Sequence, residues 1–93
     1  MTYDVRFTRS AKRALTEQLP EKVATAAWAF IMGALRDNPQ RVGKQLKEPL
    51  LPLYSARRGE YRVIYRILDE VLVVEIVTVA HRRDLFFNDV HAT

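Results

Sequence analysis

The sequence predicts an α+β domain in which an N-terminal helical hairpin packs on a mostly antiparallel four-stranded sheet. Three observations support this class: a short alternating segment at the N-terminus, two successive stretches of helical periodicity, and three successive strand-like segments in the second half. They give the order β-α-α-β-β-β, with the helices on one face of the sheet and the other face partly open. A chain of 93 residues suits one compact domain, so residues 1–93 are expected to form a single unit.

The N-terminal half holds the first strand and both helices. Over Tyr3–Phe7 apolar residues alternate with charged ones, which indicates a strand. Thr8 can cap a helix over Arg9–Gln18, and Pro20 separates this helix from a second one that ends before Asp37. The apolar stripe of the second helix consists of Val23, Ala27, Phe30, Ile31, Ala34 and Leu35.

The second half holds a loop and three strands. Pro49, Pro52 and Gly43 mark Gln40–Pro52 as a loop. Strands are expected at Leu53–Arg57, Tyr61–Leu68 and Val71–Ala80, the last apolar almost throughout, as in a central strand. A short C-terminal segment with Phe86 is expected to dock on the sheet.

Side-chain alternation places the polar residues of the last two strands. If the turn after Leu68 contains two residues, Leu68 pairs with Val71. The apolar and aromatic positions of both strands then face the helices, while Arg62 and Arg66 lie on the open face. His81 falls on the same open face and approaches Arg62. This placement depends on the turn, because a shift of one residue reverses the faces.

The charge distribution favours a polyanion partner. The net charge is +4 and the isoelectric point is about 9.8. Residues 1–40 are nearly balanced, whereas residues 41–66 hold seven basic side chains opposed only by Glu48 and Glu60. Lys44 and Lys47 fit general phosphate contacts or mere solubility about equally well. Arg62 fits a functional or a solvated residue equally well, and Arg66, with Glu75 as its partner, fits a solvated one better.

Several classes of function are excluded or disfavoured. The chain has no cysteine, which excludes thiolate metal sites, cysteine nucleophiles and disulfides. No histidine–carboxylate spacing suits a metal, and the isolated glycines form no phosphate-binding loop. Neither a signal peptide nor a run long enough to span a bilayer is visible, so a cytoplasmic protein without membrane contact is expected.

Ordered motifs over nearly the whole chain resemble the RelE/ParE toxin superfamily. The stretch from Leu53 to Ile67, with its Ser-Ala-Arg-Arg-Gly sequence, resembles the second and third strands of that family. His81-Arg82-Arg83-Asp84 after the last strand, the opening Val5–Thr8 segment and the Asn38–Leu46 segment also match. The chain is most similar to the RelE-like branch. The resemblance implies a RelE-like, microbial RNase type of fold.

The resemblance also implies a function. It implies the toxin of a type II toxin–antitoxin system, a ribosome-dependent mRNA endonuclease that inhibits translation. In that chemistry the ribose 2′-oxygen attacks the adjacent phosphate without a metal or other cofactor. The implied partners are mRNA, the ribosome and a cognate antitoxin that forms a hetero-oligomer with the toxin. Two alternatives remain: a ParE-like toxin that poisons DNA gyrase without nuclease activity, and an inactive RNA-binding module.

Site residues follow from the resemblance by position. Arg62 matches the family's transition-state arginine and Arg82 its second catalytic arginine, while His81 stands where several members place a histidine or basic residue. Arg57 and Arg58 match phosphate-binding positions. The chain departs from the family at Leu53 and Ser55, which replace proton-handling lysines, and at Phe86, which replaces a tyrosine and can stack on a base but not donate a proton. These departures leave open a different use of His81, slow cutting or a weakened toxin.

Overall fold

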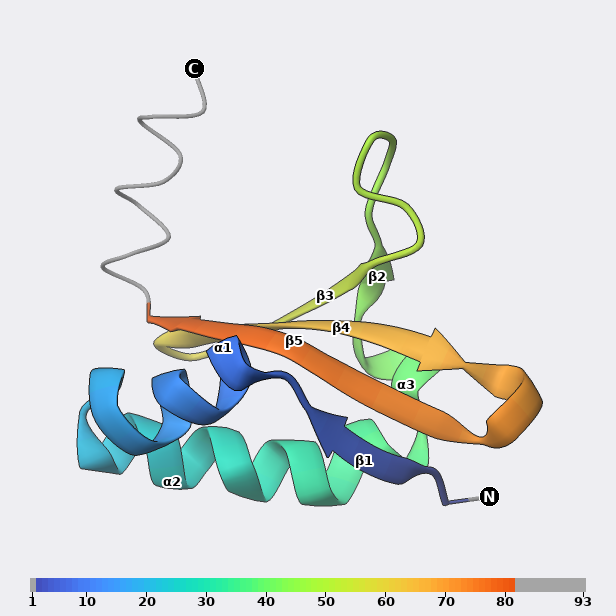
Figure 1. The fold of residues 1–93 in the computed structure, drawn as a ribbon. Coiled ribbons are helices and arrows are strands. Elements are labelled where there is room, and N and C mark those ends of the chain that lie inside the picture. The colour runs from blue at the N-terminus through green and yellow to red at the C-terminus, as the bar shows by residue number, and fades with distance from the viewer. Residues whose placement is uncertain (1, 82–93) are drawn as a thin grey trace.

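The computed structural model describes residues 2–81 as helices on one face of a five-stranded sheet (Figure 1). The sheet order is β1-β5-β4-β3-β2, with β1 parallel to β5 and every other neighbouring pair antiparallel. The elements are β1 (Asp4–Phe7), α1 (Arg9–Arg13), η1 (Ala14–Gln18), α2 (Glu21–Phe30), η2 (Ile31–Leu35), α3 (Pro39–Val42), β2 (Lys44–Gln45), β3 (Tyr54–Arg58), β4 (Tyr61–Leu68), η3 (Asp69–Val71) and β5 (Val73–His81). The predicted α+β class and the order of the main elements are confirmed.

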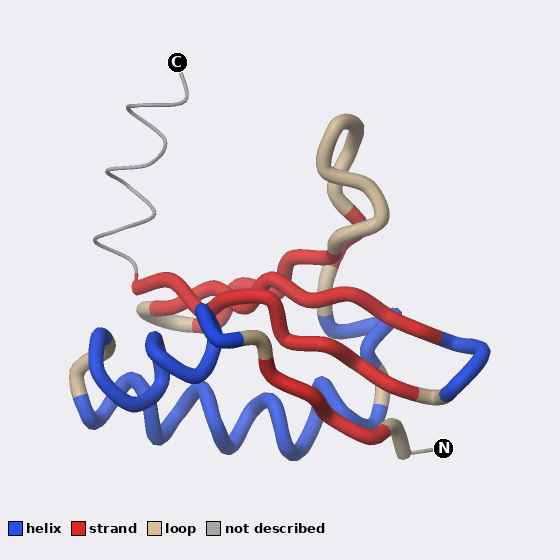
Figure 2. Tube along the Cα trace, in the orientation of Figure 1, coloured by secondary structure: helices blue, strands red, loops and turns tan. Residues whose placement is uncertain are grey.

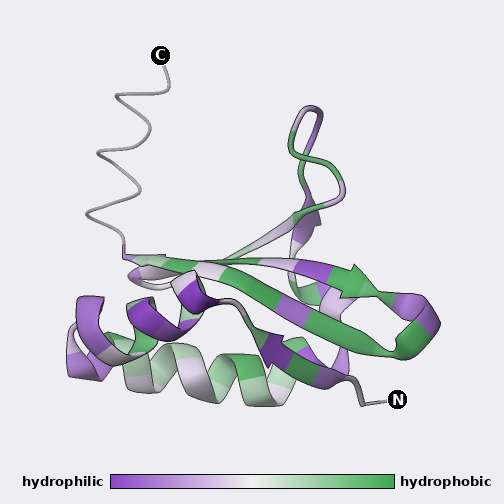
Figure 3. Ribbon diagram, in the orientation of Figure 1, coloured by the Kyte–Doolittle hydropathy of each residue, from purple (hydrophilic) through white to green (hydrophobic). Residues whose placement is uncertain are grey.

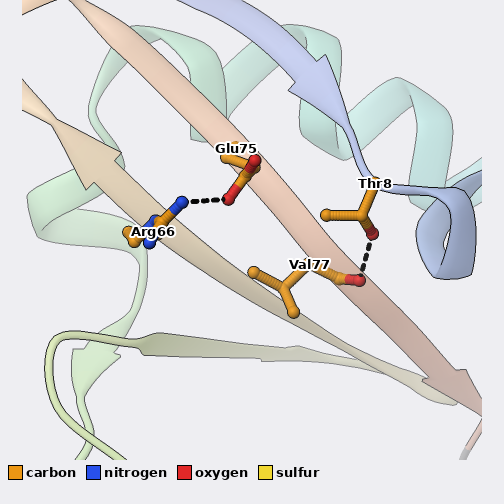
Figure 4. A network of polar contacts seen from close by, with 4 residues as sticks. All are labelled: Thr8, Arg66, Glu75 and Val77. Atoms are coloured by element: carbon orange, nitrogen blue, oxygen red, sulfur yellow. Dashed lines mark hydrogen bonds and ion pairs between the residues drawn. The ribbon is translucent and has the colours of Figure 1, made fainter.

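The helical hairpin forms as the sequence indicates. Thr8 caps α1 by accepting a hydrogen bond from the Ala11 amide at 3.1 Å. The Thr8 hydroxyl also donates to the Val77 carbonyl oxygen of β5 at 2.5 Å, which fixes the start of the helix on the sheet (Figure 4). α1 continues into the π-helical turn η1, and α2 continues into η2, so each predicted helix is one continuous segment (Figure 2). No helix within residues 2–81 is long and apolar enough to cross a membrane.

The hydrophobic core lies between this hairpin and one face of the sheet. Tyr61, Val63 and Tyr65 of β4 are buried on the helix-covered face, whereas Arg62 and Arg66 lie on the other face together with Ile64. β4 accordingly carries both hydrophobic and hydrophilic residues (Figure 3). The largest fully buried side chains are Tyr65, Ile31, Leu35, Ile76, Val63, Val73, Val74 and Pro39. The helix-covered face therefore supplies the burial that stabilises the domain, and the opposite face is free to carry polar groups.

The segment predicted as a loop contains two extra elements, so the prediction of four strands is wrong by one. α3 follows Asn38, with Pro39 at its first turn, and β2 pairs with β3 through Lys44–Ser55 and Gln45–Tyr54. A strand of two polar residues produces no detectable period-two pattern, which is why the sequence did not reveal it. Beyond it, the β2–β3 loop projects from the side of the sheet opposite the helices (Figure 1).

The expected register of the last hairpin is also wrong. A 3₁₀ turn over η3 and a left-handed Leu72 (φ 54°) make the connection longer than two residues, so Leu68 pairs with Val73. A β-bulge beside Ile64/Tyr65 then shifts the pairing by one more residue. As a result Arg62 pairs with Ala80, and His81 pairs with Tyr61 on the helix-covered face. His81 therefore does not share the open face with Arg62.

We expect the stability of the fold to fall at alkaline pH because of Tyr65. This fully buried side chain donates a hydrogen bond to the Pro39 carbonyl oxygen at 2.6 Å. Burial, with a smaller contribution from Tyr54, raises the pKa of Tyr65 from 10.0 to about 12. The folded state thus keeps its proton while the unfolded state loses it, so this contribution is complete below pH 10 and lost as pH rises towards 12.

Urea titrations at a series of pH values measure this effect. The free energy of unfolding should fall less steeply above pH 10 in Tyr65→Phe than in the wild type, although the variant is less stable at neutral pH. Equal slopes would show that another group controls the alkaline transition.

Candidate anion-binding site

Basic side chains meet on the open face of β3 and β4. Arg57 of β3 pairs directly with Arg62 of β4, so both project from the same face. Directly opposed side chains in an antiparallel pair have Cβ atoms roughly 4.5–5.5 Å apart, and like charges there repel each other. The repulsion disfavours the folded state, and a bound anion would offset it.

A hollow of about 440 Å³ adjoins this arginine pair. It lies between the α3–β2 segment and strands β3 and β4, and its basic lining residues are Arg41, Lys44, Arg57, Arg58 and Arg62. The other lining residues are Val42, Gly43, Leu46 and Ser55, so no acidic side chain is among the described residues that line it. We call this feature the basic pocket. Its charge suits a group with several anionic oxygens.

Arg62 is the least exposed cation of the basic pocket. It is half-buried, and its Nε atom is buried without a hydrogen-bond partner among residues 2–81. Within the same part of the chain, the Arg57 and Arg62 side chains form no ion pair with a carboxylate. A buried guanidinium donor without an acceptor is unfavourable, and a phosphate oxygen would supply the acceptor.

Arg66 lies on the same strand and face, and its Nε atom is likewise buried without a partner among the described residues, but it differs from Arg62 in having a carboxylate neighbour. Its Nη2 atom lies 2.7 Å from Glu75 Oε1 on β5 (Figure 4). The sequence had suggested Glu75 as a diagonal partner, and the corrected register places the two residues directly opposite each other. The charge of Arg66 is therefore neutralised by Glu75, which fits the prediction that Arg66 is a solvated residue and not a functional one.

The other predicted site residues divide into three groups. Lys44 lies in the basic pocket with the arginine pair, whereas Lys47 lies in the β2–β3 loop and does not line the pocket. Arg58 lines the pocket but pairs with Tyr61, which puts it on the opposite side of β3 from Arg57. Arg82 and Phe86 lie outside the described residues.

Arg41 is a lining residue that the sequence pattern does not single out. In the sequence it is one of seven basic residues between positions 41 and 66, and the fold places it at the basic pocket. The signal that could have found it is the short helix α3: Pro39 suits a first helical turn, which places Arg41 close to β2. Within residues 2–81, no group of three or more histidines and carboxylates could hold a metal ion.

Comparisons with known proteins identify relatives of this chain. Residues 5–86 match the family described as the ParE toxin of the type II toxin–antitoxin system parDE. The chain is 46% identical over 86 residues to Toxin RelG of Mycobacterium tuberculosis, covering 92% of this chain and 98% of that protein. It is 49% identical over 80 residues to Toxin RelE of the same organism, covering 86% of this chain and 81% of that protein.

Solved structures show the same fold. The toxin–antitoxin complex RelBE2 from M. tuberculosis contains a chain with 46% identity and a TM-score of 0.85, covering 88% of this chain and 100% of that one. The fold and the sequence relatives together define a toxin of a type II toxin–antitoxin system. The chain belongs to the RelE/ParE toxin superfamily, and its relatives place it in the RelE family.

The repulsion between Arg57 and Arg62 gives a stability prediction. At low ionic strength Arg57→Gln should stabilise the fold by about 0.5 kcal/mol, because one of two opposed positive charges is removed. For a domain of this size that raises the melting temperature by roughly 2–4 °C. Inorganic phosphate should stabilise the wild type more than the variant.

Differential scanning fluorimetry with and without phosphate provides the measurement. Arg66→Gln is the matched control, since it removes an arginine that is already paired with Glu75 and should not raise the melting temperature. A lower melting temperature for Arg57→Gln at low salt would contradict the proposed repulsion.

Proposed function

We propose that this toxin is a ribosome-dependent mRNA endonuclease and that the basic pocket holds the backbone of the message. The observation that carries the proposal is the directly opposed pair Arg57 and Arg62 at a pocket whose described lining contains no acid. A substrate with adjacent phosphates neutralises such a pocket, and single-stranded RNA presents phosphates on a flexible backbone.

The proposed reaction is an internal transesterification. The ribose 2′-oxygen loses its proton and forms a bond to the adjacent phosphorus, and the bond from phosphorus to the 5′-oxygen breaks as that oxygen gains a proton. Arg62 stabilises the negative charge that accumulates on the phosphorane oxygens. Arg57 and Lys44 hold phosphate oxygens at the same pocket, as does Arg41.

Proton transfer is assigned to His81 at the end of β5. We propose Arg82 as the second catalytic arginine, a cation for the phosphate oxygens, and Phe86 as a stacking surface for a base. His81 pairs with Tyr61 and not with Arg62, so it would act from the strand end and not from the open face. Leu53 and Ser55 stand where relatives have lysines that handle protons. We therefore expect proton transfer to limit the rate.

We further propose that an antitoxin encoded next to this toxin binds and neutralises it in the cytoplasm. Solved structures of relatives include toxin–antitoxin complexes, among them RelBE2 of M. tuberculosis and RelE–RelB of Pyrococcus horikoshii. Copurification of the toxin with the product of the adjacent reading frame tests this part of the proposal.

The activity itself is tested by adding purified toxin to a cell-free translation reaction and mapping the message by primer extension. The proposal expects new 5′ ends within translated codons, absent when ribosomes are omitted. In parallel, DNA gyrase is assayed for supercoiling with the same toxin. Intact message together with inhibited supercoiling would replace this proposal with the gyrase alternative, and no effect in either assay would favour the inactive RNA-binding module.

A further inference from the structure

Arg58 differs from the other cations of the basic pocket in what it contacts. In the β3–β4 pairing it lies opposite Tyr61, on the helix-covered side, whereas Arg57 lies opposite Arg62 on the open side. Adjacent residues of one strand thus project in opposite directions. Both were expected to hold phosphate, yet they face different surroundings.

Three parts of the protein already surround the Arg58 guanidinium. Nη1 donates to the Arg57 carbonyl oxygen at 2.8 Å, and Nη2 donates to the Val42 carbonyl oxygen at 3.3 Å. The central guanidinium carbon lies 4.7 Å from the centroid of the Phe30 ring, at the end of α2. One side chain therefore connects α2, the end of α3 and β3.

The position of the Val42 carbonyl affects the geometry of the basic pocket. Val42 stands between Arg41 and the Gly43-Lys44 step into β2, so its position affects the two pocket cations that do not belong to β3 or β4. Tyr65 fixes the other end of α3 through the Pro39 carbonyl oxygen at 2.6 Å. Arg58 and Tyr65 thus hold the two ends of this short helix against the sheet.

We propose that Arg58 is a positioning residue that holds the α3–β2 segment, so that Arg41 and Lys44 converge with Arg57 and Arg62 on one stretch of RNA backbone. This proposal rests on the proposed function, because it assumes that RNA is the polyanion. Phe30 completes the arrangement by supporting the guanidinium with its ring. The planar fork of arginine suits this role, since it can donate in two directions while its face packs on a ring.

A direct phosphate contact is the competing role for Arg58, since its side chain also lines the pocket. The two roles differ in what they predict for Phe30, an uncharged residue outside the pocket lining. If Arg58 binds phosphate itself, loss of the Phe30 ring leaves the number of phosphate contacts unchanged. If Arg58 acts through Arg41 and Lys44, loss of the ring loosens the segment and reduces that number.

The experiment measures binding of a short 2′-O-methyl oligoribonucleotide, which cannot be cleaved, at a series of salt concentrations. For single strands the logarithm of the affinity falls with that of the salt concentration by about 0.7 for each phosphate contact. We expect Phe30→Leu to weaken binding about fivefold and to flatten the slope, as Arg41→Met combined with Lys44→Met does. Phe30→Tyr keeps the aromatic ring, so its affinity and its salt slope should equal those of the wild type.

The remaining variants keep the proposal open to refutation. Arg57→Met is the control, because it removes one direct phosphate contact. Arg58→Met should reduce the salt slope by more than Arg57→Met does. Arg58→Lys keeps the charge, so it should resemble Phe30→Leu and serves in its place if that variant does not fold. A wild-type slope in folded Phe30→Leu or in Arg58→Lys would overturn the positioning role, whereas absence of binding by the wild type would count against the proposed function.

Discussion

Arg62→Ala is expected to reduce message cleavage by about 10²–10³-fold, the loss typical of removing one preorganised donor from a developing anion. The reason lies in the position of the side chain. Arg62 is half-buried, forms no ion pair with a carboxylate among residues 2–81, and is directly opposite Arg57. Such a group gains most when charge accumulates on phosphate oxygens. Quantitative primer extension at limiting toxin gives the rate.

Arg66→Ala is the matched control for this prediction. It removes the same side-chain type from the same strand and face, but one that is already 2.7 Å from Glu75. Its effect on cleavage should stay within a few fold. Arg62→Lys should restore little activity, because an ammonium group cannot make the two parallel hydrogen bonds of a guanidinium. Similar losses for Arg62→Ala and Arg66→Ala would mean that the open face acts only through its total charge.

Much of the fold could be predicted from the sequence because its signals are local. Thr8 caps a helix through its own side chain, and Pro20 starts the next helix through its fixed φ angle. The alternation along β4 separates Arg62 from Tyr61 and Val63 whatever strand lies beside it. These features depend on residues a few positions apart, which a sequence displays directly.

The register between strands could not be predicted in the same way. It depends on the length of the turn after Leu68 and on a bulge beside Tyr65, and neither feature leaves a pattern within one strand. The wrong register places His81 on the wrong face of the sheet. The face of Arg62 is predicted correctly, because it follows from alternation within β4 alone. The pair Arg57–Arg62 was likewise not foreseen, because it is a product of register between β3 and β4.

Gly43→Ala is expected to destabilise the fold by about 3 kcal/mol, as the insertion of an extra methyl group into a tightly packed site does. The backbone angles do not require glycine, since φ is −133° and ψ is −178°, an extended conformation open to any residue. The restriction is space: a Cβ atom would overlap the Tyr65 hydroxyl and lie 2.8 Å from the Ser55 carbonyl oxygen. Thermal unfolding should show a melting temperature lower by roughly 12–24 °C.

Two further variants identify the cause of this loss. Gly33→Ala in η2 is the control, because its Cβ would meet nothing within 4 Å, and alanine should stabilise the helix by about 0.5–1 kcal/mol. Tyr65→Phe removes the hydroxyl that the added methyl group would strike, so it should destabilise the Gly43→Ala protein less than it destabilises the wild type. Additive effects would place the strain at Ser55 instead, where β2 approaches the β3 backbone.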